Sequence, residues 1–460
     1  MARFWGLDVH RHVVEACAID GAGNVVARER FTCSRAELLR FAKARLAIDD
    51  ELALEATVNT WGVVGVLQPF VGRIAVGNPL KTRVIAEAKV KTDKVDAFVL
   101  AQLLRTNFLP GVWIPDAVTQ QLRRLTHRRA GLAFDRAGLS NRIHSRLSRL
   151  LLDVPASRLM SVRGREWLEN VEIPTEDRTA IDADLRLIDA YERELDALDR
   201  ELASLGYPME QVKLLMTLPG VDMNSAMTLL GAWGDITRFK SADHAAAYLG
   251  LTPSVHQSAD HCYRGRITKQ GCRHARWIMV QAAQHLDKHP GPLGHFFRKL
   301  CRRRNRHIAV VAAARKLVVI AWHVLANGEP YRYAPPRILR GKLTRLRIKA
   351  TGKRRTPGVA KGTLARAKNG LGTQTVRIPS LAELCQQEGL PAPKPLDELP
   401  MGEQRMLRQT GSLAYLERIT NPSERLIAKT YKPISNRRRP GTRTQSVPRV
   451  GDAPVTPPTK

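Results

Sequence analysis

Two aspartates that stand three residues apart are the first candidates for chemistry in this sequence. Asp93 and Asp96 lie in the stretch KVKTDKVDAFVLAQLL, each next to a lysine, where an apolar helical pattern begins. Acidic residues in a first helical turn suit the helix dipole, so a cap alone would explain the pair. The alternative is a pair of metal ligands, which requires more carboxylates from elsewhere in the chain.

Residues 1–116 carry the pattern of an α/β domain that would position these acids. The β-rich stretches FWGLDVH and VVEACAI precede a turn and a third strand, and Ser34 is a natural N-cap for a helix. The strand LALEA, a helix from Asn59, the strand RIAV and helices up to Arg105 follow. Three antiparallel strands and then alternating helices and strands predict an RNase H-like fold.

Such a fold would bring four carboxylates to one edge of its sheet. Asp8 ends the first, central strand, and Glu55 ends the fourth strand beside it. The helix that begins at Asp93 and Asp96 can pack its first turn next to both. Clustered acids raise one another's pKa unless cations are present, and oxygen ligands of this kind select Mg²⁺ or Mn²⁺. Strand-end solvation or a cap would explain each acid singly, but together they predict a divalent-metal site.

The net charge indicates a polyanionic partner. The 460 residues carry a formal charge of +31, and a ribosomal-type or membrane-surface protein would share that feature. With 43% hydrophobic residues the chain is not globally disordered. The most apolar run, residues 308–326, is interrupted by Arg315 and Lys316 and predicts a buried helix, so no membrane span is expected. Six cysteines without a CxxC pair and no secretory signal favour a reducing cytoplasm.

Three further segments follow the first domain. Residues 117–205 have apolar residues at helical spacing and predict a paired helical stalk, whose arginines either contact nucleic acid or form a solvated face. Residues 206–334 predict a mainly helical domain, in which LPGV resembles a helix-hairpin-helix turn that points backbone amides at a phosphate. Residues 335–460 predict a basic, largely flexible, disordered tail; from residue 331 onwards, 27 lysines and arginines face eight acids.

The sequence resembles the DEDD-type insertion-sequence transposases, the bridge-RNA-guided serine recombinases. The resemblance spans roughly residues 4–333 and rests on GLDVH, LEATVNTWG, NPLKTRVIAEAKVKTDKVDAFVLAQLL, LPGV, AAYLGLTPSVHQS and RGRITKQGCRHAR. It implies a RuvC-like first domain and a serine-bearing transposase domain at residues 206–334. It also implies the DEDD tetrad, which would be Asp8, Glu55, Asp93 and Asp96.

The resemblance further implies a serine nucleophile that forms a covalent link to DNA. Ser258 in VHQSADH stands where the family has this serine, although Ala259 replaces the glycine that commonly follows. Ser254 in TPSVH is a weaker rival. No Ser–His–Asp order around Ser258 is convincing, so the metal site is the expected activator.

Basic residues near both sites are expected to contact nucleic acid. They are Lys91, Lys94, Arg264, Arg266, Lys269, Arg273 and Arg276. Four residues near the serine, His261, Cys262, Cys272 and His274, match the spacing of no standard zinc module, so zinc is not expected.

The sequence therefore predicts a transposase that cuts and rejoins DNA strands in the bacterial cytoplasm, at the nucleoid. The resemblance implies donor and target DNA, a structured noncoding guide RNA, and a homo-oligomer, a dimer or tetramer, with a composite active site. A RuvC-like junction resolvase or nuclease that uses the four acids and water is the alternative enzyme. A nucleic-acid-binding protein with a degenerate site is the alternative outside enzymes.

Overall fold

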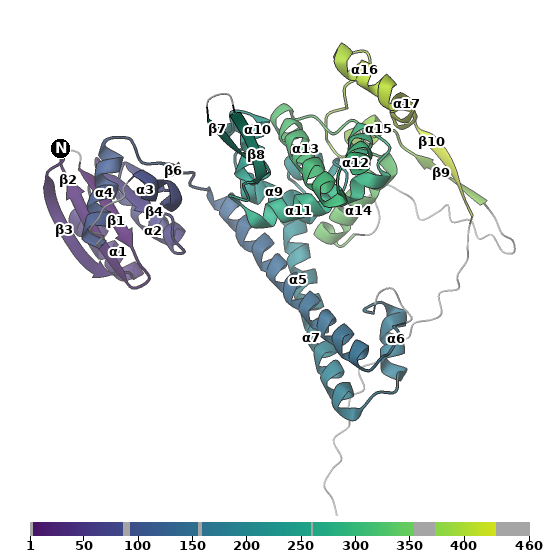
Figure 1. The fold of residues 1–460 in the computed structure, drawn as a ribbon, viewed down its shortest axis with the longest axis horizontal. Coiled ribbons are helices and arrows are strands. Elements are labelled where there is room, and N and C mark those ends of the chain that lie inside the picture. The colour runs from purple at the N-terminus through teal and green to yellow at the C-terminus, as the bar shows by residue number, and fades with distance from the viewer. Residues whose placement is uncertain (1–2, 86–92, 155–158, 259–260, 354–372, 429–460) are drawn as a thin grey trace, which may run out of the picture. The chain divides into compact units, whose positions relative to one another are not determined.

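The computed structural model forms two units, residues 1–121 and residues 122–460 (Figure 1). The residues that it describes are 3–85, 93–154, 159–258, 261–353 and 373–428. The first unit is a sheet with helices, and the second is mainly helical. The second unit contains the predicted stalk from residue 122 onwards, together with the predicted second domain and tail.

A six-stranded mixed sheet organises the first unit. The strand order is β3-β2-β1-β4-β5-β6. The strands are β1 Phe4–Val9, β2 Val13–Ile19, β3 Val25–Thr32, β4 Glu51–Glu55, β5 Arg73–Gly77 and β6 Gly111–Val112. The first three strands are antiparallel, whereas β4 is parallel to β1 and β5 is parallel to β4. This arrangement is compatible with the predicted RNase H-like fold.

Helices cover both faces of this sheet. They are α1 Arg35–Arg45, α2 Thr60–Leu67, α3 Pro79–Ile85 and α4 Asp93–Arg105. The hydroxyl of Ser34 accepts a hydrogen bond from the Glu37 amide at 3.2 Å and caps α1, as its position predicts. Trp5 and Leu7 of β1 bury their side chains in the core formed with α1 and α2. The alternate residues of β1 face α4 on the opposite side of the sheet.

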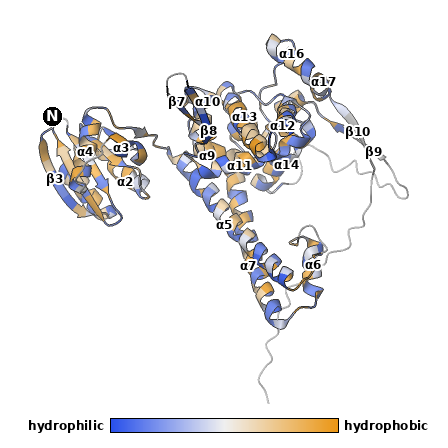
Figure 2. Ribbon diagram, in the orientation of Figure 1, coloured by the Kyte–Doolittle hydropathy of each residue, from blue (hydrophilic) through white to orange (hydrophobic). Residues whose placement is uncertain are grey.

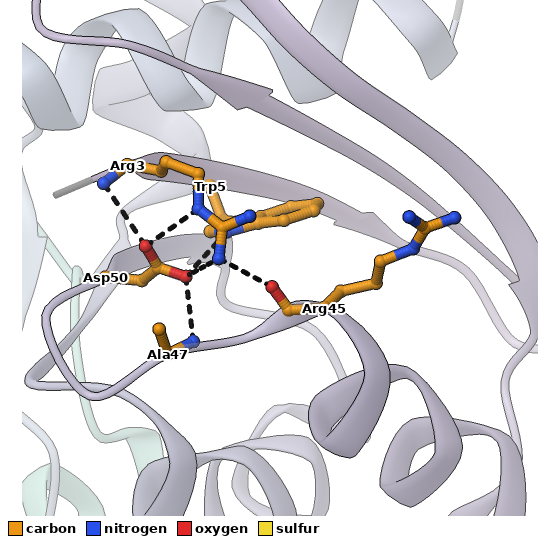
Figure 3. Close-up of polar contacts among 5 residues, drawn as sticks. All are labelled: Arg3, Trp5, Arg45, Ala47 and Asp50. Carbon is orange, nitrogen blue, oxygen red and sulfur yellow. Dashed lines mark hydrogen bonds and ion pairs between the residues drawn. The ribbon is translucent and has the colours of Figure 1, made fainter. Parts of the chain in front are cut away.

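A buried carboxylate ties the start of β1 to the start of β4 (Figure 3). The Asp50 side chain is 1% exposed and accepts hydrogen bonds from Nε of Arg3 at 3.0 Å, Nε1 of Trp5 at 3.2 Å and the amide of Ala47 at 2.9 Å. Burial disfavours the charge, but the bonds from Arg3 and Ala47 and the charge of Arg3 outweigh it and lower the pKa of Asp50. These bonds help to fix the register between the two strands.

Two long antiparallel helices form the stalk of the second unit, α5 Ala117–Arg149 and α7 Thr175–Gly206, with α6 Val162–Asn170 packed at one end. Both long helices carry hydrophobic and hydrophilic residues side by side (Figure 2). Their ion pairs are Arg128–Glu194, Arg129–Asp199, Arg136–Glu192, Arg142–Asp184 and Arg146–Asp177. Many arginines of α5 are therefore paired with acids inside the stalk. From the sequence alone, a solvated helical face and contact with nucleic acid were equally favoured interpretations of these arginines.

The second unit buries a large helical core. The helices that follow the stalk are α8 Glu210–Met216, α9 Met223–Trp233, α10 Ala242–Tyr248, α11 Arg273–Gln284, α12 Pro292–Arg303 and α13 Arg306–Asn327. By length and composition α13 would be able to cross a membrane, and it is mostly orange in Figure 2. It carries Arg315 and Lys316, however, and buries Ala313, Leu317 and Ala321 in the core, as soluble core helices do.

Much of the predicted tail is folded, which corrects the prediction of a disordered segment. Its elements are α14 Pro336–Thr351, β9 Thr373–Ile378, α15 Leu381–Gln387, α16 Met401–Thr410, α17 Leu413–Thr420 and β10 Ser423–Ala428. Leu343 and Leu384 belong to the core of the second unit, and the Tyr415 hydroxyl donates to the Tyr333 carbonyl at 3.0 Å. Charge counting over the whole segment hid these apolar positions; those of α14, such as Leu343, are spaced between arginines and lysines. Residues 354–372 and 429–460 lie outside the described residues.

Candidate active site

The register of two parallel strands places Asp8 and Glu55 at the same end of the sheet. Leu7 of β1 pairs with Leu54 of β4, and each acid follows its leucine directly. Both leucines are buried on the α1 and α2 side. Because successive strand residues point to opposite faces, Asp8 and Glu55 both belong to the face that α4 covers.

Gly6 allows α4 to lie directly on β1. A Cβ atom at Gly6 would stand 1.9 Å from the carbonyl oxygen of Ala97 and 2.6 Å from the amide nitrogen of Ala101. No side chain fits at such distances, so only glycine permits this approach. The position of α4 over the sheet therefore depends on one residue of β1.

Helix α4 runs in the opposite direction to β1. Nε2 of Gln102, near the end of α4, donates at 3.0 Å to the Gly23 carbonyl, which follows the end of β2. Ile19 at that end of β2 pairs with Phe4 at the start of β1, whereas Gly6 lies against Ala97 nearer the start of α4. The first turn of α4 consequently lies toward the carboxyl end of β1, which is where Asp8 stands.

The predicted acids and lysines of α4 are placed in this first turn. Asp93 begins the helix, but its side chain, like the whole of Lys91, lies outside what the structure describes. Asp96 is half-buried and Lys94 is exposed. The backbone carbonyl of Lys94 accepts a hydrogen bond from Nη1 of Arg28 at 3.1 Å, which ties this turn to β3.

A further carboxylate, which the sequence reasoning missed, stands directly beside Asp8. Glu15 of β2 is the antiparallel partner of Asp8, so the two residues share one face of the sheet. The Glu15 side chain is 8% exposed and forms an ion pair with Arg30 at 3.2 Å. Nε2 of His10 lies 3.1 Å from Oδ2 of Asp8. The only sequence signal for Glu15 is an acid inside the apolar run VVEACAI, where a buried charge needs a partner.

The described side chains do not by themselves form a metal site. Among them, no group of three or more histidine, cysteine, aspartate or glutamate side chains is arranged to hold an ion, and the Asp93 side chain is not in this set. The donor types nevertheless fit Mg²⁺ or Mn²⁺, because carboxylate oxygens are the hard ligands that these ions prefer. Glu15 adds a carboxylate to this edge, but its charge is already paired with Arg30.

The predicted nucleophile lies at the end of a β-hairpin in the second unit. Strands β7 Pro253–Ser258 and β8 His261–Ile267 are antiparallel, and Ser258 pairs with His261 as the last pair. The side chain of Ser258 and residues 259–260 lie outside the described residues. The rival Ser254 is half-buried, and its hydroxyl lies 2.3 Å from where a Cβ atom of Gly265 would stand. Ser254 is therefore packed against the neighbouring strand.

The cations predicted around the hairpin differ in their surroundings. Four of them are exposed: Arg264, Arg266, Lys269 and Arg273. Arg276 is half-buried, and its Nη1 donates to the Leu249 carbonyl at 2.9 Å and approaches the Gln270 carbonyl at 3.5 Å. Arg276 thus anchors the base of the hairpin to the end of α10, and its contact with nucleic acid stays a prediction.

In the segment between α8 and α9, some of the backbone amides that would contact a phosphate are already bonded within the protein. The Val221 amide donates to the Leu218 carbonyl at 3.3 Å. The Asp222 carboxylate caps α9 by accepting from the amide and the hydroxyl of Ser225, each at 2.8 Å. The carboxylate of Asp222 therefore already binds one of the amides at the start of α9, and the predicted phosphate contact stays a prediction.

Two family profiles match this chain, and both describe transposases. Residues 5–151, which include the sheet and the start of the stalk, match the transposase profile of the DEDD type found in IS110. Residues 212–297, which run from α8 into α12, match the profile described as "Transposase IS116/IS110/IS902 family". The chain therefore belongs to the DEDD transposases of the IS110 type.

Individual relatives agree with this family. The putative transposase y4qE of Sinorhizobium fredii is 28% identical over 195 residues, or 42% of this chain and 48% of the relative. The transposase for insertion sequence element IS1111A of Coxiella burnetii is 28% identical over 127 residues, or 27% and 35% of the two chains. The pilin gene-inverting protein of Moraxella lacunata is 24% identical over 274 residues, which are 56% of this chain and 74% of the relative. The match thus spans less than half the length of the first two relatives.

Proposed function

We propose that this protein is the transposase of an insertion sequence and that it cuts and rejoins DNA strands through a covalent link to Ser258. The observation that carries the proposal is the register that sets Asp8 and Glu55 at one end of one sheet face, beneath the start of α4. Membership of a transposase family supports it. A relative named for inverting a gene favours strand rejoining over simple cleavage.

The four acids Asp8, Glu55, Asp93 and Asp96 would hold Mg²⁺ or Mn²⁺. Bound divalent ions would polarise the phosphate and make a hydroxyl more acidic. The Glu15–Arg30 ion pair lies beside Asp8 on the same face of the sheet and would hold the Glu15 carboxylate there. Gly6 would keep the start of α4, with its two aspartates, at the distance that this site needs.

Ser258 would supply the attacking oxygen. Its Oγ forms a bond to phosphorus while the bond from phosphorus to one deoxyribose oxygen breaks, and the departing sugar oxygen takes up a proton. The sugar hydroxyl of a second strand then attacks the same phosphorus, which releases the serine and joins the strands. Each step exchanges one phosphate ester bond for another, so no external energy source is needed. A serine hydroxyl is a weak nucleophile at neutral pH. It therefore needs a base to accept its proton, or a nearby metal ion that makes the hydroxyl more acidic so that water takes up the proton.

The proposed partners are donor and target DNA together with a structured noncoding guide RNA. Exposed Arg264, Arg266, Lys269 and Arg273 would hold phosphates near the hairpin, with Lys94 beside the acids. We include a homo-oligomer, a dimer or tetramer, in the proposal, because the family resemblance implies a composite active site. The acids and the serine belong to different units of the chain, which would meet within one subunit or across two.

Trapping the covalent intermediate tests this function. The full-length protein is incubated with Mg²⁺ and nicked or junction DNA, denatured, and examined for protein-linked DNA, with the linked residue identified by mass spectrometry. Ser258→Ala should abolish the adduct while DNA binding and Mn²⁺ binding persist. The matched variant Ser254→Ala should retain the adduct. Asp93→Ala should abolish it through a loss of Mn²⁺ affinity.

Two results would contradict the proposal. Hydrolysed DNA ends without any adduct would indicate a metal-dependent nuclease or resolvase of the RuvC type. An adduct that maps to Ser254, or strand exchange by Ser258→Ala, would show that the serine is assigned wrongly.

A further inference from the structure

A pocket of about 890 Å³ lies within the second unit between α5, the start of α9 and α11. Its lining includes His127 and Phe134 of α5, Asn224 of α9, Cys272 just before α11, and His274 and Trp277 of α11. This volume is within the range of pockets that bind small molecules or single groups of larger ligands. The proposed chemistry gives this pocket no role.

Aromatic rings form one wall of the pocket. The rings of His274 and Trp277 are nearly parallel, with their centroids 6.2 Å apart and their planes at 17°. Trp277 is 56% exposed, and Phe134, across the pocket on α5, is 79% exposed. Large flat rings left in contact with solvent are suited to stacking against another flat ring.

Two residues that line the pocket each have a buried polar atom without a partner in the described part of the chain. Oδ1 of Asn224 and Nε2 of His274 have no hydrogen bond within the described residues. Buried polar atoms are rarely left unsatisfied, so a ligand with its own donors and acceptors is expected. Burial and the nearby charges of His127 and Arg129 lower the pKa of His274, so its ring is neutral at pH 7 and Nε2 is able to donate or accept.

The charges around the pocket favour a base over a phosphate inside it. The exposed Asp222 carboxylate lines the pocket and already caps α9, so a second anion there would be repelled. Arg129 lines the pocket but is paired with Asp199 at 2.5 Å. Arg273 is exposed and is suited to bind a phosphate that lies outside the pocket. A nucleotide whose base enters the pocket and whose phosphate lies at Arg273 is compatible with these charges.

We propose that this pocket takes one unpaired nucleobase of a DNA or RNA strand, stacked on Trp277 and hydrogen-bonded to Asn224 and His274. The inference rests on the proposed function, since it takes nucleic acid as the partner. With a net charge of +31 on the whole chain, a strand of nucleic acid is a better occupant than a protein segment. Base stacking on an aromatic side chain tolerates any sequence.

The test compares strands that have bases with strands that lack them. Binding of the full-length protein to 20-nucleotide oligothymidylate, to oligouridylate and to an abasic strand of the same length and charge is measured by fluorescence anisotropy at one salt concentration. Stacking of one base contributes about 1–3 kcal/mol, so Trp277→Ala should weaken binding of the base-bearing strands about tenfold. Its affinity for the abasic strand should not change, which also shows that the variant is folded.

Two variants serve as controls. Trp277→Phe keeps an aromatic surface and should retain most of the affinity. Phe108→Ala removes a ring that is 64% exposed in the first unit and should leave binding of all strands unchanged. If only oligothymidylate or only oligouridylate responds to Trp277→Ala, the pocket takes its base from DNA or from RNA, respectively.

Cys272 provides a second readout of pocket occupancy. Burial disfavours its thiolate, but a hydrogen bond with His127 and backbone amides outweighs burial and lowers the pKa of the thiol, which favours alkylation. Iodoacetamide labelling of Cys272 should be slowed by oligothymidylate and not by the abasic strand. Labelling of Cys301, which lies on α12 outside the pocket, should respond equally to both strands.

Some outcomes would overturn the inference. Equal weakening of base-bearing and abasic strands by Trp277→Ala would show a phosphate or structural role. Unchanged binding accompanied by a change in sedimentation would show that another copy of the chain covers the pocket. These results are distinguishable from a failure of the proposed function, because the Ser258 adduct is measured separately. A protein without an adduct that still prefers bases would refute only the transposase chemistry.

Discussion

Substitution of Gly6 by alanine tests how closely the acids of the proposed site must be placed. The new methyl group would stand 1.9 Å from the Ala97 carbonyl oxygen, and real contacts of this kind are not shorter than 3.0 Å. Strand β1 and helix α4 would therefore have to separate by about 1 Å, at a cost of about 1–3 kcal/mol in stability. Because α4 begins with Asp93 and Asp96, both acids would move away from Asp8. A displacement of about 1 Å at a catalytic group lowers a rate by about 100-fold.

The assay measures the single-turnover rate of adduct formation with Mg²⁺, together with hydrogen exchange of α4 in the full-length protein. Gly6→Ala should slow the rate about 100-fold and increase exchange in α4. Gly62→Ala is the matched control, because Gly62 lies in α2 with no heavy atom within 4 Å of its added Cβ. That variant should keep its rate and gain up to about 1 kcal/mol of helix stability. A Gly6→Ala protein with a wild-type rate and unchanged exchange would refute the proposed dependence on α4.

Two further predictions concern the end of the chain and a buried histidine. Removing residues 429–460, which hold eight lysines and arginines against one aspartate, should flatten the dependence of DNA affinity on salt, and an unchanged slope would exclude phosphate contacts there. His289 is 5% exposed and accepts a hydrogen bond at Nδ1 from the Gly291 amide at 3.1 Å, and burial lowers its pKa to about 4. The unfolded chain binds this proton first, near pH 6.5, so the free energy of unfolding should fall by up to about 3 kcal/mol between pH 6.5 and 4. His289→Gln should remove that part of the pH dependence in chemical denaturation, and equal acid sensitivity of both proteins would contradict the assignment.

The elements that carry the proposed active site follow from local sequence. Alternating β-rich stretches predict the strands that end at Asp8 and Glu55, and Ser34 predicts the start of α1. These features depend on side-chain period and capping, which act over a few residues. The same local patterns predict the long helices of the stalk.

The tertiary structure decides which charged side chains are paired. The sequence could not show that Glu15 would stand opposite Asp8, because strand register is set by contacts between distant residues. For the same reason it could not show that α7 would neutralise arginines of α5, or that Arg276 would bond backbone carbonyls.

The sequence by itself determined the family, the order of the elements and the residues that have the right chemistry. Tertiary structure decided what surrounds those residues. Apolar side chains spaced between the arginines of α14 became core once α7 and α8 lay beside them, and a pocket formed where α5, α9 and α11 meet. Burial and pairing are properties of neighbours in space, so a pattern read along the chain predicts a residue's chemistry but not its environment.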